Sequence, residues 1–207
     1  MKKIQDGFLV SIEGIDGSGK SSLARNIHKK LLDYSCVLTK EPGGTPLGEK
    51  IRSILLQTDA VMCAKAEFLL FASSRAEHFE KLVIPALKNG SLVISDRMAD
   101  SSLVYQGYAR GLDIPTIDAV STWAMNNVKP NVTFYLKLSV EKALERIKKR
   151  NIALTTFEQE EAFIHKTLDG FEELFKNRTD VVILDAIDSQ ELLADKAVEE
   201  LSKRIGK

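Results

Sequence analysis

The sequence predicts an α/β protein in three layers, with a five-stranded parallel sheet between helices on both faces. Five short apolar segments alternate with longer segments in which apolar residues recur every three or four positions, as on one face of a helix. Segments that are apolar at nearly every position are typical of strands buried on both faces of a parallel sheet. A glycine-rich loop also stands between the first strand and the first helix, which is where this class places a phosphate-binding loop.

The length and composition are those of a single globular domain, residues 1–207. Apolar residues make up 44% of the chain, charged residues make up 28%, and the formal net charge is zero. A net charge of zero does not indicate a polyanion-binding surface, so we expect no nucleic-acid partner. A local basic cleft stays open, because the net charge says nothing about how charges are distributed.

The chain is expected to be cytoplasmic and to lack a membrane segment. Cys36 and Cys63 have neither the spacing of a metal site nor a disulfide framework, and Cys36 lies in a strand-like apolar run. The basic start of the chain is followed by an apolar run only at 8–12, which is too short for a signal peptide. No apolar stretch approaches the length of a membrane span.

The first strand is predicted at 8–12, and the helix that follows carries Leu23, Ile27 and Leu31 on its apolar face. Between them, residues 14–21 fit the pattern G-x-x-x-x-G-K-[ST]. The backbone N–H groups of such a loop and the helix N-terminus surround a phosphate chain. Lys20 would contact the β- and γ-phosphates, and the Ser21 hydroxyl would bind Mg²⁺.

The alternative interpretation of this motif is a glycine turn that happens to carry a lysine. The strand, loop and helix come in the required order, so we favour a nucleotide site. Its predicted residues are Gly14, Ile15, Asp16, Gly17, Ser18, Gly19, Lys20, Ser21 and Ser22.

Between the second strand, at 36–39, and the third strand, at 91–95, we expect a loop and two helices. The loop at 40–46 is indicated by its Pro-Gly and Gly-Gly pairs. A long helical segment is predicted at 64–87, and Pro85 is expected to kink or end it. The helix before it has an apolar face made of Leu47, Ile51, Ile54 and Leu55.

After the third strand, residues 100–126 are expected to be helical with breaks near Gly107 and Gly111, and Trp123 is expected to pack in the core. The last two strands are predicted at 132–136 and 181–184. Helices are expected at 140–149, 157–176 and 192–205, with a polar break at 150–156. The histidines are interpreted as surface or helix-end residues: His28, His78 and His165.

Chemistry-bearing residues follow the first three strands. Ligands of parallel sheets bind at the carboxyl ends of the strands, so the glycine loop, the loop at 40–46 and the Asp96-Arg97 pair should share one edge. Asp96 ends an apolar strand, as the metal-binding acid of a phosphate-loop protein does, although an acid that caps the following helix is the alternative.

Phosphoryl transfer also needs positive charge around the migrating group, and arginine suits it because of its bidentate guanidinium. Arg52, Arg75 and Arg97 lie on or beside the site-facing loops. Each alone could be a solvated surface charge. Arg97 is the strongest of the three candidates, because it directly follows the proposed metal acid.

A base-binding pocket needs an apolar or aromatic wall and a few polar groups. Phe71 and Arg75 are four residues apart on one predicted helix face. Hydroxyl, aromatic and amide groups are offered by Ser101, Ser102, Tyr105 and Gln106. On periodicity alone, Phe71 and Tyr105 could equally be core residues.

The motifs together resemble thymidylate kinase of the bacterial type, a P-loop nucleoside monophosphate kinase. The glycine loop is generic. The stretches Glu41-Pro42-Gly43-Gly44-Thr45, Phe71-Ala72-Ser73-Ser74-Arg75, and Asp96-Arg97 followed by Asp-Ser-Ser-Leu-Val-Tyr-Gln-Gly at 100–107 are far more specific. The resemblance covers essentially the whole chain. It implies a P-loop NTPase fold, a homodimer, and transfer of the ATP γ-phosphoryl group to dTMP with Mg²⁺, for dTTP synthesis.

The resemblance also implies a role for each matched residue. Asp16 would bind the deoxyribose 3′-hydroxyl, and Arg52 and Arg97 would hold the acceptor phosphate. Phe71 would stack on thymine, Arg75 would contact its O4, and Ser102 and Gln106 would bind the base edge. Tyr105 would exclude a ribose 2′-hydroxyl, and Glu41 and Asp96 would serve the metal and phosphate region. The complete expected dTMP site is Asp16, Glu41, Pro42, Arg52, Phe71, Arg75, Arg97, Ser101, Ser102, Tyr105 and Gln106.

The expected metal ligands are Ser21, Asp96 and Glu41, and the expected catalytic residues are Lys20, Asp16, Arg97, Asp96 and Arg150.

The sequence departs from the family in its expected lid, residues 150–157. Members without an arginine in the P-loop normally have arginines there, whereas this chain has Ile152 and Thr156 at the corresponding positions. An arginine that reaches the transition state contributes roughly 10³-fold or more to the rate. Either Arg150, Lys149 or Arg146 replaces it, or the enzyme is slow. Arg146 would lie beside ATP. The alternatives to this activity are another nucleoside monophosphate as acceptor, or a nucleotide-binding switch without catalysis.

Overall fold

The fold is a three-layer α/β sandwich in a computed structural model that describes residues 1–57, 61–149 and 161–205. Five parallel strands form the sheet in the order β2-β3-β1-β4-β5, and their bounds are β1 Phe8–Glu13, β2 Cys36–Lys40, β3 Leu92–Asp96, β4 Val132–Lys137 and β5 Val181–Asp185. All five lie where the sequence predicts them, which confirms the predicted fold class.

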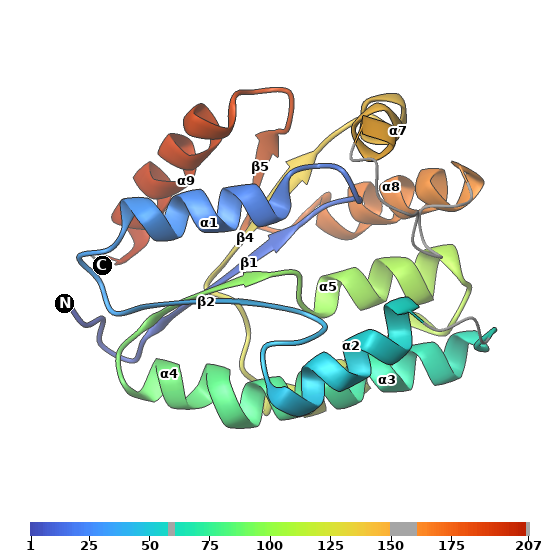
Figure 1. Ribbon diagram of the computed structural model, residues 1–207, viewed down its shortest axis with the longest axis horizontal. Helices are drawn as coiled ribbons and strands as arrows, with labels where there is room; N and C mark the ends of the chain where they lie inside the picture. The colour runs from blue at the N-terminus through green and yellow to red at the C-terminus, as the bar shows by residue number, and fades with distance from the viewer. Residues whose placement is uncertain (58–60, 150–160, 206–207) are drawn as a thin grey trace.

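Helices cover both faces of the sheet (Figure 1). The α-helices are α1 Lys20–Lys30, α2 Pro46–Gln57, α3 Ala64–His78, α4 Ile84–Lys88, α5 Ala99–Ser102, α6 Ile114–Ala124, α7 Val140–Lys149, α8 Glu161–Phe175 and α9 Gln190–Ile205. Two π-helical segments join them, η1 Phe79–Val83 and η2 Leu103–Ala109. Among the described helices, none combines the length and the apolar character that crossing a bilayer requires.

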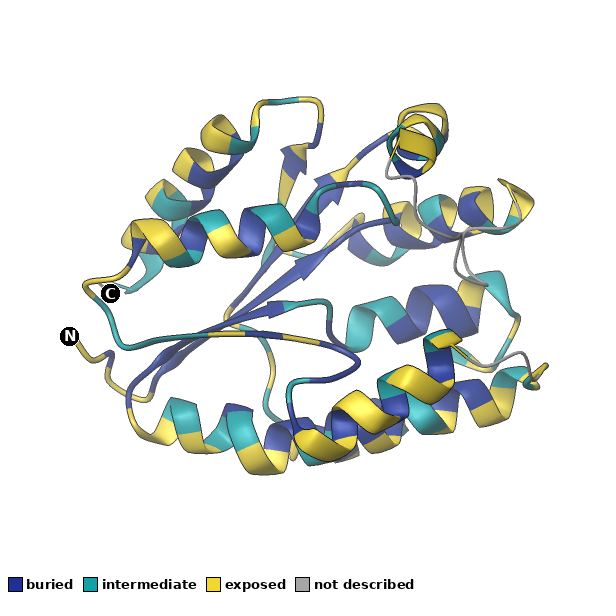
Figure 2. Cartoon of the chain, in the orientation of Figure 1, coloured by how far each residue is buried: buried dark blue, intermediate teal, exposed yellow. Residues whose placement is uncertain are grey.

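Successive residues of β1 face opposite sides of the sheet and so belong to two cores. Val10 and Ile12 pack in the cluster that contains Leu23 and Ile27 of α1. Leu9 packs on the other side with Phe79 and other buried residues. Figure 2 shows β1 buried along its whole length, which explains why the sequence of this central strand is apolar rather than alternating.

The long helical segment predicted at 64–87 is helical throughout, with a π-helical turn where α3 meets α4. Pro85 has no N–H to donate to the preceding turn, and η1 ends two residues before it, at Val83. The wider π turn lets the helix continue through the proline instead of ending there.

Residues 100–126 break at Gly111 as predicted, but not at Gly107. Gly111 has a φ of 77°, while Gly107 lies inside η2. A Cβ at Gly107 would lie 2.2 Å from Ile114 Cδ1. The glycine therefore permits the close approach of α6 and does not mark a helix end.

The apolar face expected on α2 is only partly buried, and the expected burial of Trp123 was wrong. On α2, Ile51 and Leu55 are buried together with Gly48, whereas Leu47 and Ile54 are exposed. Trp123 is 76% exposed on α6 and is not a core residue. These three apolar side chains lie on α2 and α6, each of which packs against α3.

Candidate active site

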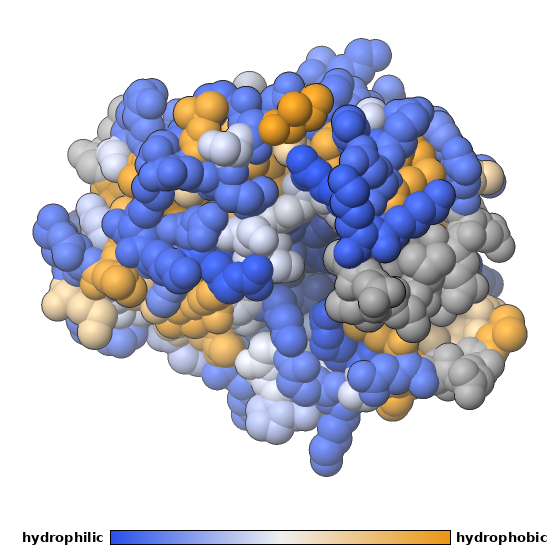
Figure 3. All heavy atoms as spheres, turned by 45° about the horizontal axis from the view of Figure 1, so that its top comes forward, coloured by the Kyte–Doolittle hydropathy of each residue, from blue (hydrophilic) through white to orange (hydrophobic). Residues whose placement is uncertain are grey.

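A cavity of about 490 Å³ lies at the carboxyl edge of the sheet. It is lined by the glycine loop and by the segments that follow β2 and β3, together with α3, η2 and α7. The space-filling view is hollowed at its centre, with mostly hydrophilic residues around the opening (Figure 3). The predicted site residues that line the cavity are Asp16, Gly17, Gly19, Lys20, Ser21, Ser22, Glu41, Pro42, Arg52, Phe71, Arg75, Asp96, Arg97, Ser101, Ser102, Tyr105, Gln106 and Arg146.

Three predicted residues of the glycine loop do not line the cavity. Ile15 and Ser18 are buried, and a Cβ at Gly14 would lie 2.7 Å from the carbonyl oxygen of Leu136. Gly14 has a φ of 146°, so both its backbone and its packing require glycine. These three residues therefore contribute to the conformation of the loop rather than to the cavity wall. Arg150, a predicted catalytic residue, lies outside the described residues.

The phosphate end of the cavity carries Lys20 at the start of α1. Its Nζ donates to the carbonyl oxygen of Ile15 at 2.8 Å and lies 3.9 Å from Asp16 Oδ1. Burial lowers the pKa of Lys20 to about 8, and the charge of Arg97 acts in the same direction. A bound anion such as a phosphate would stabilise the positive charge of this buried lysine.

Ser21 and Asp96 meet at the same end. The Ser21 hydroxyl donates to Asp96 Oδ2, and both residues line the cavity. Hydroxyl and carboxylate oxygens are hard ligands that suit Mg²⁺, which keeps several waters and binds phosphate oxygens besides. The pair therefore fits a magnesium ion bound together with a nucleotide.

Arg97 connects the glycine loop to η2. Its Nη1 donates to the carbonyl oxygen of Gly14 at 3.0 Å and to Ser101 Oγ at 2.9 Å. Its Nη2 donates to Asp16 Oδ1 at 2.5 Å and to Tyr105 Oη at 3.0 Å. With a φ of 71°, Arg97 also adopts a backbone conformation that non-glycine residues rarely adopt, which is frequent at functional sites.

Glu13 is a buried carboxylate beneath this arginine that the sequence analysis missed. Its Oε1 accepts from the Met98 N–H at 2.7 Å, and its Oε2 accepts from Ser101 Oγ at 2.6 Å. Burial raises the pKa of Glu13 to about 7, and the nearby charge of Asp100 adds to the rise. Glu13 therefore fixes the segment that carries Arg97. Its position, one residue before the glycine motif at the end of a buried strand, was a signal in the sequence.

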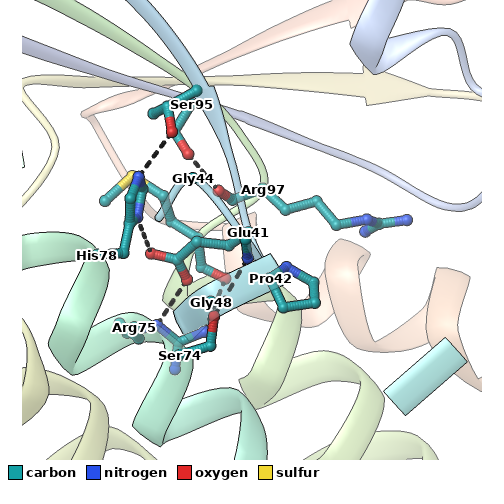
Figure 4. A network of polar contacts seen from close by, with 12 residues as sticks. Glu41, Pro42, Gly44, Gly48, Ser74, Arg75, His78, Ser95 and Arg97 are labelled. Carbon is teal, nitrogen blue, oxygen red and sulfur yellow. Dashed lines mark hydrogen bonds and ion pairs between the residues drawn. The ribbon is translucent and has the colours of Figure 1, made fainter. Parts of the chain in front are cut away.

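Arg75 is held by a buried network (Figure 4). Its Nε donates to Glu41 Oε2 at 2.8 Å, and its Nη2 donates to Ser102 Oγ at 3.0 Å. His78 ends α3, as one of its two interpretations expected, but it is 0% exposed and so is not a surface residue; it contacts Glu41 Oε1 at 3.1 Å. The carboxylate can only accept, which makes His78 Nδ1 the donor and lets Nε2 accept from Thr39 Oγ1 at 2.8 Å.

Both carboxylate oxygens of Glu41 thus accept hydrogen bonds from protein side chains. Burial alone would raise the pKa of Glu41, but the charge of Arg75 and the hydrogen bond from His78 outweigh it, so the pKa lies below its ordinary value. In this arrangement Glu41 orients Arg75, and its carboxylate is turned toward α3 rather than offered to a metal ion.

The remaining cations differ in how they meet the cavity. Arg52 Nη1 donates to the carbonyl oxygen of Pro42 at 2.9 Å, and both residues line the cavity. Arg146 lines the cavity from α7 and donates to the carbonyl oxygen of Ala186 at 2.8 Å. Lys149 points elsewhere, since it is exposed and pairs with Glu145 at 2.7 Å.

Comparison with known proteins gives one consistent result. The thymidylate kinase family model matches residues 12–197. The thymidylate kinase of Halothermothrix orenii is 49% identical over 142 residues, which cover 68% of this chain and 69% of that protein. The thymidylate kinase of an Exiguobacterium species is 36% identical over 205 residues, which cover 96% of each. The crystal structure of thymidylate kinase from Ehrlichia chaffeensis superposes with a TM-score of 0.77 at 28% identity, covering 94% of this chain and 98% of that one.

Proposed function

The chain belongs to the thymidylate kinase family and is a kinase, and we propose that it transfers the γ-phosphoryl group of ATP to dTMP, with Mg²⁺, for DNA synthesis. The observation that carries this proposal is the cavity itself. One end presents Lys20 and Ser21, which suit a triphosphate, and the other end presents Phe71 and Gln106, which suit a base. Two nucleotides bound there would meet with their phosphates facing each other.

The acceptor would bind across α3 and η2. Phe71 would stack on the thymine ring, and Arg75 would face the O4 edge from its buried network. Asp16 would receive the 3′-hydroxyl, while Tyr105, whose hydroxyl contacts Arg97, would close the space of a ribose 2′-hydroxyl. Arg52 and Arg97 would hold the acceptor phosphate, and Ser101 would keep Arg97 in place.

Transfer itself would depend on positioning and positive charge rather than on a general base. Lys20, Arg97 and Arg146 line the cavity and can surround the three oxygens of the migrating group. Ser21 and Asp96 would hold Mg²⁺. When bound, the ion would neutralise charge on the phosphate oxygens.

The test is to measure ADP release by the purified protein with ATP and Mg²⁺, using dTMP, dUMP, dCMP, dGMP or no acceptor. Turnover strongest with dTMP is the expected result. Turnover strongest with another monophosphate would overturn the assigned acceptor and leave the reaction class standing. ATP binding without transfer to any acceptor would instead favour a nucleotide-binding switch.

We also propose a cytoplasmic homodimer. Two features support it. Cys36 and Cys63 are free thiols, which suits a reducing compartment. The helices α2, α3 and α6 expose large apolar side chains, and such surfaces are typical of protein interfaces. These side chains are Leu47, Ile54, Leu69 and Trp123.

A further inference from the structure

Glu67 is a buried carboxylate at the base end of the cavity that the proposed mechanism leaves without a role. It is 3% exposed, in the first turn of α3, and it lies four residues before Phe71 and eight before Arg75. Residues at that spacing share one helix face. Burying a carboxylate costs free energy unless partners compensate it.

Two donors converge on one oxygen of this carboxylate. Gln106 Nε2 donates to Glu67 Oε1 at 2.8 Å, and Arg110 Nε donates to the same atom at 2.8 Å. Gln106 is 1% exposed and lines the cavity. Its amide is therefore held by a partner that can only accept hydrogen bonds.

This contact decides which end of the Gln106 amide faces the cavity. Because Glu67 accepts the hydrogen bond from Nε2, the acceptor Oε1 is the free end, and no side chain in the described part of the chain donates to it. Rotation of the amide by 180° would place Oε1 against the carboxylate, and two acceptors in contact in a buried site repel each other.

We propose that Glu67 is a specificity-determining positioning residue, which fixes Gln106 so that an acceptor oxygen meets the pyrimidine N3 position. Thymine and uracil carry N3–H, a donor, whereas cytosine N3 is an acceptor. The fixed amide accepts from the first two bases and opposes the third. This inference rests on the proposed function, since it concerns the base of the acceptor nucleotide.

Arg110 extends the argument to a difference between two substitutions at position 67. In Glu67→Gln, the Arg110 N–H would hold the new amide with its oxygen toward both donors, so Gln106 would keep its orientation. In Glu67→Met, a side chain of similar length supplies no strong acceptor, and the Gln106 amide is released. Loss of the ion pair alone would affect both variants alike.

The experiment measures kcat/KM for dTMP, dUMP and dCMP with wild type, Glu67→Met, Glu67→Gln and Arg110→Gln. We expect the dTMP-to-dCMP ratio of Glu67→Met to fall about tenfold or more, since its buried amide can turn toward either base. The dTMP-to-dUMP ratio should stay within about twofold, because both bases carry N3–H. Glu67→Gln and Arg110→Gln should keep the wild-type ratios.

An unchanged dTMP-to-dCMP ratio in Glu67→Met would overturn the inference. So would a fall in Glu67→Gln or Arg110→Gln equal to that in Glu67→Met, since the ion pair would then be responsible. Wild-type protein that phosphorylates none of the three nucleotides would overturn the proposed function instead.

If Glu67→Met does not fold, the double variant Glu67→Gln with Arg110→Leu replaces it. Nothing then holds the amide at position 67, and its dTMP-to-dCMP ratio should fall while that of Glu67→Gln does not. Binding of dTMP and dCMP measured by calorimetry provides the same comparison without turnover. Equal ratios in the two variants would overturn the inference.

Discussion

At the scale of single residues, the site depends on buried carboxylates that hold other side chains in place. Glu13 holds the segment after β3, Glu41 holds Arg75, and Glu67 holds Gln106. Each carboxylate is buried and accepts hydrogen bonds from donors on other elements, so each fixes a segment or side chain that we propose to contact substrate. The geometry of the site thus depends on these three buried carboxylates as much as on the arginines that line the cavity.

Glu13 should make the stability of the protein depend on pH. Its pKa is raised from 4.5 to about 7 by burial and by Asp100, so between these values the folded state binds more protons than the unfolded state. This contribution to stability is therefore fully present below pH 4.5 and is lost as the pH rises through 7. Relative to Glu13→Gln, which stays neutral, the wild type should lose about 3 kcal/mol of unfolding free energy over this range.

Urea unfolding at several pH values between 4.5 and 8 measures this difference. Glu173→Gln, an exposed substitution on α8, controls for the removal of one carboxylate. Parallel stability curves for wild type and Glu13→Gln would contradict the prediction.

At the scale of elements, the packing of α8 against η2 sets the position of Tyr105 and Gln106. Gly170 makes this approach possible, since a Cβ there would lie 2.8 Å from Tyr108 Cβ and 3.1 Å from Val104 Cγ1. Tyr108 Cβ is bonded directly to the backbone and cannot move aside by a side-chain rotation, so the helices must separate to accept a methyl group.

Gly170→Ala should therefore lower the unfolding free energy by about 1–3 kcal/mol and raise KM for dTMP more than KM for ATP. Asp169→Ala, exposed on the same helix, is the matched control and should change neither. Thermal unfolding and steady-state kinetics measure both effects. A variant with equal shifts in the two KM values would show that η2 does not transmit the change to the acceptor.

The C-terminal end of α7 should supply the cation that replaces the expected lid arginines. Arg146 lines the cavity and is already fixed to the carbonyl oxygen of Ala186, and Arg150 follows the last described residue of α7. Arg150→Ala is expected to lower kcat more than it raises KM if its guanidinium meets the transition state. Arg146→Ala should mainly raise KM for ATP, because its contacts lie beside the glycine loop.

Single-turnover kinetics separate these two outcomes, and Lys149→Ala, which removes an exposed cation paired with Glu145, is the control. An unchanged kcat in Arg150→Ala would assign the role to another cation.

At the scale of the whole molecule, α2, α3 and α6 expose large apolar side chains. We expect light scattering to give twice the chain mass for the wild type. Leu69→Glu combined with Trp123→Glu should give monomers, because charges at an apolar contact are left unpaired. Leu192→Glu introduces the same charge at an exposed apolar residue of α9 and should leave the mass unchanged. A monomeric wild type would contradict the proposed assembly.

The sequence predicted the strands, their common functional edge and most cavity-lining residues, because these depend on local patterns. Apolar runs identify buried strands, and the glycine loop carries its own spacing rule. The contacts of Glu13 with Met98 and Ser101, of Glu67 with Gln106 and of His78 with Glu41 could not be predicted, because they join residues 37 to 88 positions apart in sequence. The prediction that Trp123 packs in the core was wrong because periodicity identifies an apolar helix face but does not show whether that face is buried or exposed.

The position of β1 at the centre of the sheet has a consequence for how the chain acquires its site. Phe8 pairs with Leu92, and Val10 pairs with Val132, so the strand that leads into the glycine loop finds no neighbour until much later segments exist. Closing such long loops is slow, with folding on the order of milliseconds to seconds for sheets dominated by distant pairings. During synthesis, β1 cannot pair until β3 and β4 have been made, and β4 begins only at Val132. We therefore expect nucleotide binding to begin only after both of these strands have paired with β1.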